Sequence, residues 1–266
     1  MFFRVAIITM SAIAFAQADE WKNDSLWHDG LVEKATYLAS RPIYGKDRQY
    51  EAVIFTNKEQ HDLKTLTKAS GSTDTVEVWK HNLIEVVPTP NYDYTFATTT
   101  HMTAGAMELT RLDCSSQEFC GTSFKQFLQR PGSGSLDYFA FSYMPEAGRV
   151  EGKIDAGGRK FVPVDSLGLW LRDYDFVNRP KVSFSTIVTQ KSNRPTSAKL
   201  MDAQVTFAGE EADAFKLEVH AAGQLIGSYW MAKDRLHVMV RAELADGQKY
   251  ALKQVQRVDY WTIVGE

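Results

Sequence analysis

The densest group of reactive side chains in this sequence lies between Ser115 and Gly121. Here Cys120 could act as a thiol nucleophile and Gln117 as an oxyanion donor. Such chemistry needs a histidine base, but the spacing places no histidine beside Cys120, and no cysteine-hydrolase signature surrounds it. The histidines that would have to supply the base are His28, His61, His81, His101, His220 and His237.

The same segment has a structural interpretation. In it, Phe119 packs in a buried strand and Glu118 pairs with a cation such as Arg172, together with Gln117 and Cys120 in one polar cluster. An ion pair of this kind fixes strand register and does no chemistry. Motif matches without geometry are mostly false, so we favour this interpretation and expect no catalytic residue. A hydrolase using Cys120 stays as an alternative.

The histidine spacing does not favour a metal site. The pairs at 28–29, 61–62 and 81–82 are isolated, and the sequence contains neither H-x-x-x-H nor H-E-x-x-H. Gly157-Gly158 lacks the Lys-Ser/Thr that follows in a phosphate-binding loop, so it indicates a turn. We therefore expect no metal and no cofactor.

Two cysteines, Cys114 and Cys120, leave two alternatives open. An oxidising compartment would favour a disulfide between them, but six residues of strand or helix hold two Cα atoms too far apart to bridge. A disulfide therefore requires a tight loop over residues 114–120. The other interpretation is an extended segment with two free thiols.

The N-terminus has the pattern of a cleaved secretory signal. Arg4 precedes an apolar run from Val5 to Ala16, and residues 16–18 read Ala-Gln-Ala, the small-residue pattern before a cleavage site. The run is short for a bilayer span, and polar residues follow at once. The sequence therefore predicts a signal peptide over 1–18 and one β-rich domain over 19–266, exported to the periplasm or secreted, with no membrane span after cleavage.

Composition excludes several classes of protein. The chain has 266 residues, 44% of them hydrophobic, with 30 Lys and Arg against 33 Asp and Glu. That apolar content excludes a disordered chain, a collagen and a coiled coil. The scattered charges provide no basic surface for nucleic acid.

Alternation of apolar and polar residues predicts the architecture. The last fifty or so residues read as a four-stranded antiparallel meander, with Asp246-Gly247 as a hairpin turn. A short helix is expected over Asp165 to Arg172, capped by Asp165 or Ser166, and a weak one over Glu59 to Lys68. The sequence thus predicts a mainly β protein, one strongly curved antiparallel sheet or open half-barrel of about a dozen strands with one or two short helices. The strands expected upstream of the meander are 32–39, 48–56, 76–87, 92–102, 106–112, 136–143, 148–155, 182–188 and 199–207.

Aromatic residues recur with strand parity. If the sheet is bent, its concave face would present them as a pocket for an apolar or ring-bearing ligand, although a filled core is the commoner fate of such stripes. The residues expected to line that pocket are Tyr92, Tyr94, Phe96, Phe139, Phe141, Tyr143 and Trp170.

Short motifs over most of the mature chain resemble a group of uncharacterised exported bacterial proteins, a domain of unknown function. That group is distantly similar to periplasmic half-barrels that carry or sort lipoproteins. In those carriers a bent antiparallel sheet encloses an apolar cavity for acyl chains. The resemblance implies no catalytic residue, and it includes Cys120 without Cys114. The motifs are Trp27 to Gly30, Arg41 to Gly45, Arg48 to Ala52, Tyr92 to Tyr94, Ser115 to Gly121, Leu169 to Arg172, Asp246-Gly247 and Arg257 to Trp261.

These observations lead to one expectation of function and two alternatives. We expect an exported protein that binds or carries a hydrophobic small molecule or lipid in the cell envelope. A structural or assembly factor with an envelope protein as partner is the first alternative, and the hydrolase above is the second.

Overall fold

A computed structural model describes residues 21–119, 121–145, 148–194 and 198–261 of the chain. The predicted signal peptide over 1–18 and the side chain of Cys120 lie outside these ranges. Within them, no helix has the length and apolar content needed to cross a bilayer.

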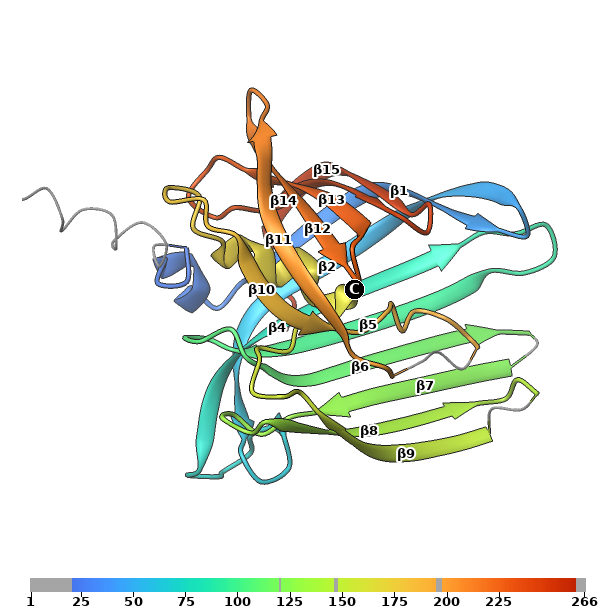
Figure 1. Cartoon of the computed structure of the whole chain (residues 1–266), viewed down its shortest axis with the longest axis horizontal. Helices are drawn as coiled ribbons and strands as arrows, with labels where there is room; N and C mark the ends of the chain where they lie inside the picture. The colour runs from blue at the N-terminus through green and yellow to red at the C-terminus, as the bar shows by residue number, and fades with distance from the viewer. Residues whose placement is uncertain (1–20, 120, 146–147, 195–197, 262–266) are drawn as a thin grey trace, which may run out of the picture.

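Strands make up most of the described chain (Figure 1). They are β1 (Val32–Ile43), β2 (Lys46–Asp62), β3 (Thr67–Lys68), β4 (Thr75–Val87), β5 (Tyr94–Thr103), β6 (Leu109–Glu118), β7 (Gly121–Leu128), β8 (Ser135–Ser142), β9 (Gly148–Asp155), β10 (Val182–Thr186), β11 (Met201–Glu210), β12 (Ala214–Ala221), β13 (Gln224–Ala232), β14 (Met239–Leu244) and β15 (Lys249–Val258).

All the strands belong to one antiparallel sheet in the order β10-β11-β12-β13-β14-β15-β1-β2-β4-β5-β6-β7-β8-β9, with β3 paired to β2. The sheet bends strongly but does not close, since β9 and β10 are its two ends (Figure 1). The predicted fold class is confirmed, and so is the C-terminal meander, which is β12 to β15. At the β10 end, Phe161 forms a parallel bridge to Ser185 and covers that edge.

The chain between β9 and β10 packs inside the bend of the sheet. It contains η2 (Val164–Ser166), α1 (Leu167–Trp170) and η3 (Leu171–Asp173), and this helical stretch is the one predicted over Asp165 to Arg172. A Cβ added at Gly168 would lie 3.6 Å from the Met239 sulfur and 3.7 Å from His81 Nε2, so the helix is held between β14 and β4. We call residues 156–181 the plug, because they fill the space that the bent sheet surrounds.

The predicted helix cap is wrong. Neither Ser166 nor a residue before it caps α1 or η2 through its side chain. Asp165 instead accepts hydrogen bonds from Thr189 Oγ1 at 2.5 Å and from the Gln190 amide at 2.6 Å. Backbone carbonyls accept from the amides at the start of this stretch, since Val164 donates to Ile187 at 3.4 Å and Ser166 to Pro163 at 2.9 Å. The Asp165 carboxylate is therefore left to tie the plug to the chain that follows it.

The helix expected over Glu59 to Lys68 is also wrong. Strand β2 continues to Asp62, and Glu59 and His61 pair with Val78 and Val76 of β4. Pairing along a long neighbouring strand outweighs a weak local helix preference. The sequence also missed β7 as a separate strand, because its polar inner residues hide the alternation.

The disulfide is not formed in the described structure. Cys114 is a free, buried thiol in β6, and that strand stays extended to Glu118, so the tight loop that a bridge requires is missing. Burial raises the pKa of the Cys114 thiol well above its usual value, and the negative charge of Asp165 raises it further. Cys114 is therefore a protonated core residue.

Candidate functional site

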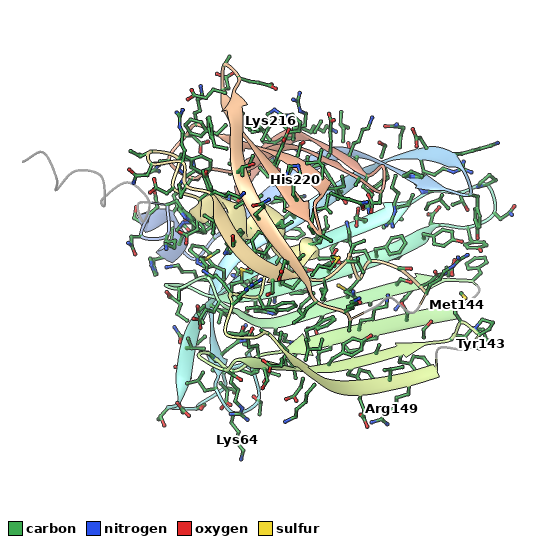
Figure 2. All side chains as sticks on the ribbon, viewed as in Figure 1. Lys64, Tyr143, Met144, Arg149, Lys216 and His220 are labelled. Carbon is green, nitrogen blue, oxygen red and sulfur yellow. The ribbon has the colours of Figure 1, made fainter. Side chains whose placement is uncertain are left out.

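Four hairpin turns lie at one rim of the bent sheet, and each presents an aromatic side chain. They connect β1 to β2, β4 to β5, β6 to β7 and β8 to β9, which the antiparallel order places at the same end of the strands (Figure 1). Their aromatic residues are Tyr44, Tyr92, Phe119 and Tyr143, of which Tyr143 is labelled in Figure 2. We call these four, with Tyr94 beside them, the aromatic rim.

Three members of the aromatic rim are too exposed to serve as core. Tyr44 is 72% exposed, Phe119 83% and Tyr143 71%. Single exposed apolar residues are ordinary on a protein surface, but several at one edge indicate a contact surface.

Ring contacts join most of the rim into one continuous surface. Phe119 stacks on Tyr92 with ring centroids 4.7 Å apart, and Tyr92 lies 5.4 Å from Tyr94. The Tyr94 and Tyr44 hydroxyls share a hydrogen bond. Behind them, Tyr94 stacks on buried Phe96 at 6.2 Å. The outer rings are thus fixed to the core through Tyr94.

At two of the turns, an unusual backbone conformation or a glycine helps to place an aromatic side chain of the rim. Tyr44 has a φ of 54° and Gly45 of 70°, the left-handed pair of a two-residue hairpin turn, in which asparagine is the usual first residue. A tyrosine there is strained, and such strain points to a function. At Gly121, an added Cβ would lie 2.6 Å from Tyr143 Cδ1, so the Tyr143 ring rests directly on the glycine backbone.

The structure brings together four of the seven aromatic residues predicted to line a pocket. Tyr92, Tyr94 and Phe96 gather at the rim with Tyr143. Trp170 lies instead in the plug against Phe184 at 4.9 Å.

The remaining two predicted pocket residues lie on the convex face. Tyr138 faces inward, where it contacts buried Phe127 at 4.8 Å, so its neighbours Phe139 and Phe141 face outward. Phe141 is 44% exposed and Phe139 is partly buried. The alternation in the sequence correctly placed Phe139 and Phe141 on the same face of the strand, but it could not show which face of the sheet points inward.

Beneath the rim, residues 189–194 cross the mouth of the bent sheet, and we call this segment the strap. Serine side chains of two strands hold it: Ser123 donates to the Ser192 carbonyl at 2.9 Å, and Ser142 to the Asn193 carbonyl at 2.6 Å. Lys125 Nζ donates to the carbonyls of Gln190 and Ser192 at 3.1 and 3.0 Å. The strap therefore closes the rim side of the interior.

A buried charge network fixes the middle of the strap. Lys191 Nζ donates to Glu85 Oε2 at 3.1 Å, Gln248 Oε1 at 2.9 Å and the Tyr250 hydroxyl at 2.7 Å. Burial alone would lower the pKa of Lys191, but Glu85 and Asp165 raise it above its usual value. Burial opposes ionisation of Glu85 too, yet Lys191 lowers its pKa. Both groups are charged at neutral pH.

A small cavity of about 50 Å³ lies inside, between the plug and the sheet. Its lining is mostly apolar, with Lys191 and Asp165 among the polar residues. Ligand pockets usually measure roughly 300–1,000 Å³, so this cavity has room for a few waters and not for an acyl chain. The apolar lining residues are Ile54, Leu83, Val164, Met239, Ala242 and Leu244.

The predicted polar cluster does not assemble. Arg172 pairs with Glu33, at 2.9 Å to both carboxylate oxygens, and both side chains are buried. Glu118 accepts a hydrogen bond from Asn193 of the strap, and Gln117 is exposed. The partner proposed for Arg172 from the sequence was Glu118, whereas the structure pairs it with Glu33, and a pairing across 139 residues has no local signal.

Buried His81 should make stability fall in acid. Its ring lies 2.9 Å from Thr56 Oγ1, and burial, followed by Arg172, lowers its pKa from 6.5 to about 3. Between those pH values His81 is protonated in the unfolded chain but not in the folded protein. Its contribution to the free energy of unfolding is therefore fully present above pH 6.5 and is lost as the pH falls toward 3.

For His81→Gln we expect the slope of unfolding free energy against pH to decrease in this window by up to about 1.4 kcal/mol per pH unit. Urea unfolding at a series of pH values measures it, with exposed-face His220→Gln as control. Equal slopes for wild type and H81Q would contradict the assignment.

The fold can be compared with known proteins. The chain is similar to a crystal structure described as a β-barrel-like protein of the domain of unknown function DUF1849 from Brucella abortus, with 10% sequence identity and a TM-score of 0.48. The match covers 86% of this chain and 98% of that one. No protein-family model matches the sequence, and no curated protein matches it. At this level of similarity, neither an activity nor a residue role can be transferred.

Proposed function

We propose that this is an exported binding protein that contacts a lipid of the cell envelope through its aromatic rim. The observation that carries the proposal is the gathering of three exposed aromatic residues and the half-buried Tyr92 on four turns at one edge. Export is proposed from the signal pattern over residues 1–18.

The chemistry of the rim suits a lipid interface. Tyrosine has an apolar ring and a polar hydroxyl, the combination found where one end of a side chain is buried in lipid and the other is wet. Tyr44, Tyr92 and Tyr143 have this character, and Phe119 adds a wholly apolar ring. The strap and plug occupy the interior, so the turns are the accessible apolar surface at this end.

Vesicle binding tests the proposal. The protein from residue 19 is titrated with zwitterionic phosphatidylcholine vesicles, and bound protein is measured by co-sedimentation. Burial of one aromatic ring contributes about 1.5–3 kcal/mol, so Phe119→Ser and Tyr143→Ser should each weaken binding about tenfold or more. Val177→Ser removes a side chain that is 52% exposed outside the rim, and binding should not change. Equal partitioning of all three variants and wild type would refute the role of the rim.

Tyr44→Asn separates binding from folding within the same test. Asparagine accepts the left-handed conformation at the first position of this turn, so we expect an unchanged or higher Tm. Vesicle binding should nevertheless fall, because a ring that is 72% exposed is removed. A lower Tm with unchanged binding would show that Tyr44 serves the fold alone.

Carriage of a hydrophobic ligand inside the sheet is a second candidate, favoured by the apolar lining of the cavity beneath Lys191. At about 50 Å³ the cavity must grow before it holds an acyl chain, which requires the strap to move. Native mass spectrometry of the purified protein distinguishes the candidates. Lipid that co-purifies equally with wild type and with F119S/Y143S would support the interior site over the rim.

A further inference from the structure

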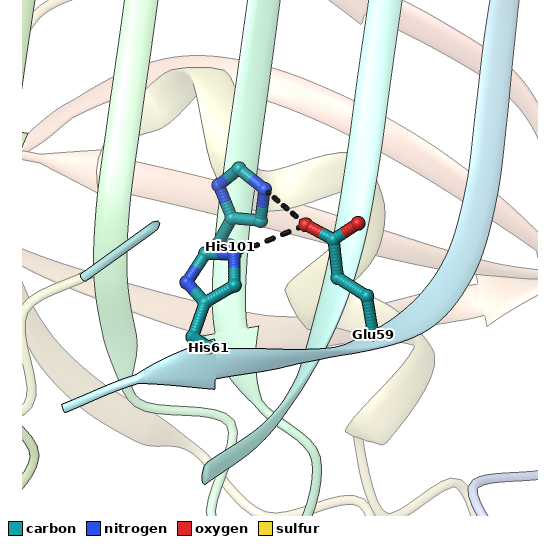
Figure 3. A group of neighbouring side chains, drawn as sticks. All are labelled: Glu59, His61 and His101. Atoms are coloured by element: carbon teal, nitrogen blue, oxygen red, sulfur yellow. Dashed lines mark hydrogen bonds and ion pairs between the residues drawn. The ribbon is translucent and has the colours of Figure 1, made fainter. Parts of the chain in front are cut away.

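Two histidines and a glutamate converge on the convex face of the sheet, away from the rim and the plug. Glu59 and His61 are alternate residues of β2, and His101 comes from β5 (Figure 3). In β2 the inward residues include Ile54 and Thr56, so the odd-numbered Glu59 and His61 face outward. Three donor side chains from two strands that are not neighbours thus meet at one point.

The group is buried although it lies on the outer face. His61 is 1% exposed and His101 6%, and the Glu59 side chain is 8% exposed. The turn that follows β2 is fastened nearby, since Arg111 donates to the carbonyl of buried Leu66 at 3.3 Å. Water therefore has little access to the three side chains.

The donor atoms are spaced as metal ligands are. Glu59 Oε1 lies 3.0 Å from His61 Nε2 and 3.3 Å from His101 Nε2, and one donor atom from each residue falls within 4.8 Å of the others (Figure 3). Zinc bonds of about 2.0–2.1 Å in a tetrahedron place neighbouring ligand atoms about 3.4 Å apart. Small rotations of the three side chains would bring their donor atoms to bonding distance from an ion at the centre.

Hydrogen bonding alone leaves the cluster incompletely satisfied. Glu59 Oε2, His61 Nδ1 and His101 Nδ1 are buried without a hydrogen-bond partner among the described residues. The nitrogens that face Glu59 are the Nε2 atoms, so an ion held there would leave both Nδ1 atoms unchanged, and Glu59 Oε2 is the orphaned atom that it could satisfy. Lys80 forms an ion pair with Glu59, with its Nζ 3.7 Å from Glu59 Oε2.

We propose that Glu59, His61 and His101 bind one divalent transition-metal ion of the zinc type. Two imidazole nitrogens and a carboxylate form a ligand set suited to Zn²⁺, with a fourth position for water. The ion would tie β2 to β5 across β4 and hold the turn after β2. The isolated histidine pairs in the sequence concealed this site, because the second histidine comes from 40 residues further along the chain.

Metal titration of the metal-free protein provides the test. Zn²⁺ is competed against a chromophoric chelator, and Co²⁺ is added in parallel to report coordination through its visible absorption. We expect one ion per chain and tetrahedral Co²⁺ bands. His61→Gln and His101→Gln should weaken Zn²⁺ binding at least about tenfold, the smallest loss expected for a direct ligand. His220→Gln is the matched control with an intact cluster, and its affinity should equal that of wild type.

Lys80→Gln keeps the proposal testable if a histidine variant fails to fold. Removal of the ammonium group next to Glu59 leaves all three ligands in place and should strengthen Zn²⁺ binding severalfold. The Tm of wild type and K80Q should rise with added Zn²⁺, because an ion that binds only the folded state stabilises it. Absence of stoichiometric binding, or affinity unchanged in H61Q, H101Q and K80Q, would overturn the proposal.

Discussion

Replacement of Arg172 by leucine is expected to lower the free energy of unfolding by about 3–5 kcal/mol. The Arg172 side chain is 1% exposed and that of Glu33 3%, and the guanidinium donates to both carboxylate oxygens at 2.9 Å. The leucine variant leaves the carboxylate buried without its cation, which costs more than the ion pair contributes. Urea unfolding followed by tryptophan fluorescence measures the loss, since Trp21 and Trp27 lie beside Arg172.

The double variant Glu33→Leu/Arg172→Leu is the control for this prediction. With both charges removed, the buried carboxylate no longer opposes folding, so we expect at least half of the lost stability to return. A double variant as unstable as R172L would mean that Arg172 acts through packing on the tryptophans and not through its charge.

Lys191→Met should also cost about 3–5 kcal/mol at neutral pH, with a pH dependence that identifies the cause. Glu85 is fully buried and depends on Lys191 to hold its pKa low. Without the ammonium group, burial raises the pKa of Glu85 above its unfolded value. The contribution of Glu85 to the stability of the variant is then greatest at low pH, where Glu85 is protonated in both states, and is lost as the pH rises through the folded pKa. The deficit relative to wild type should shrink on acidification.

Two measurements check this second prediction. Unfolding free energies of wild type and K191M at a series of pH values give the deficit directly, and Glu85→Gln/Lys191→Met should abolish its pH dependence. Hydrogen exchange of the strap should accelerate in K191M, because Lys191 fixes the middle of that segment. A deficit that is constant with pH would assign the effect to lost packing.

The architecture was predictable because alternation is local. Strands such as β12 and β14 have one apolar and one polar face, so residue parity alone identifies them. Strand β7 was harder, since Ser123 and Lys125 occupy inward positions where apolar residues are expected. Their polar character has a reason that only the fold reveals: both donate to carbonyls of the strap.

The candidate sites were only partly predictable, because they join residues far apart in sequence. Tyr92 and Tyr94 were chosen correctly as neighbours, but the contribution of Tyr44 depends on the β1–β2 turn reaching the same edge. The helix of the plug was predicted, but its position inside the sheet was not. Because the plug fills the interior, the predicted hollow is reduced to a cavity of about 50 Å³. The buried pairs Arg172–Glu33 and Lys191–Glu85 bridge 139 and 106 residues, beyond any motif.

The pairing of β1 with β15 has a consequence for how the molecule is assembled. The sheet consists of two runs of hairpin-linked strands, and they are joined where the first strand meets the last. The two runs cannot pair with each other until residues 249–258 have left the ribosome. A chain built this way can complete its sheet only after its last strand has become available to pair with its first.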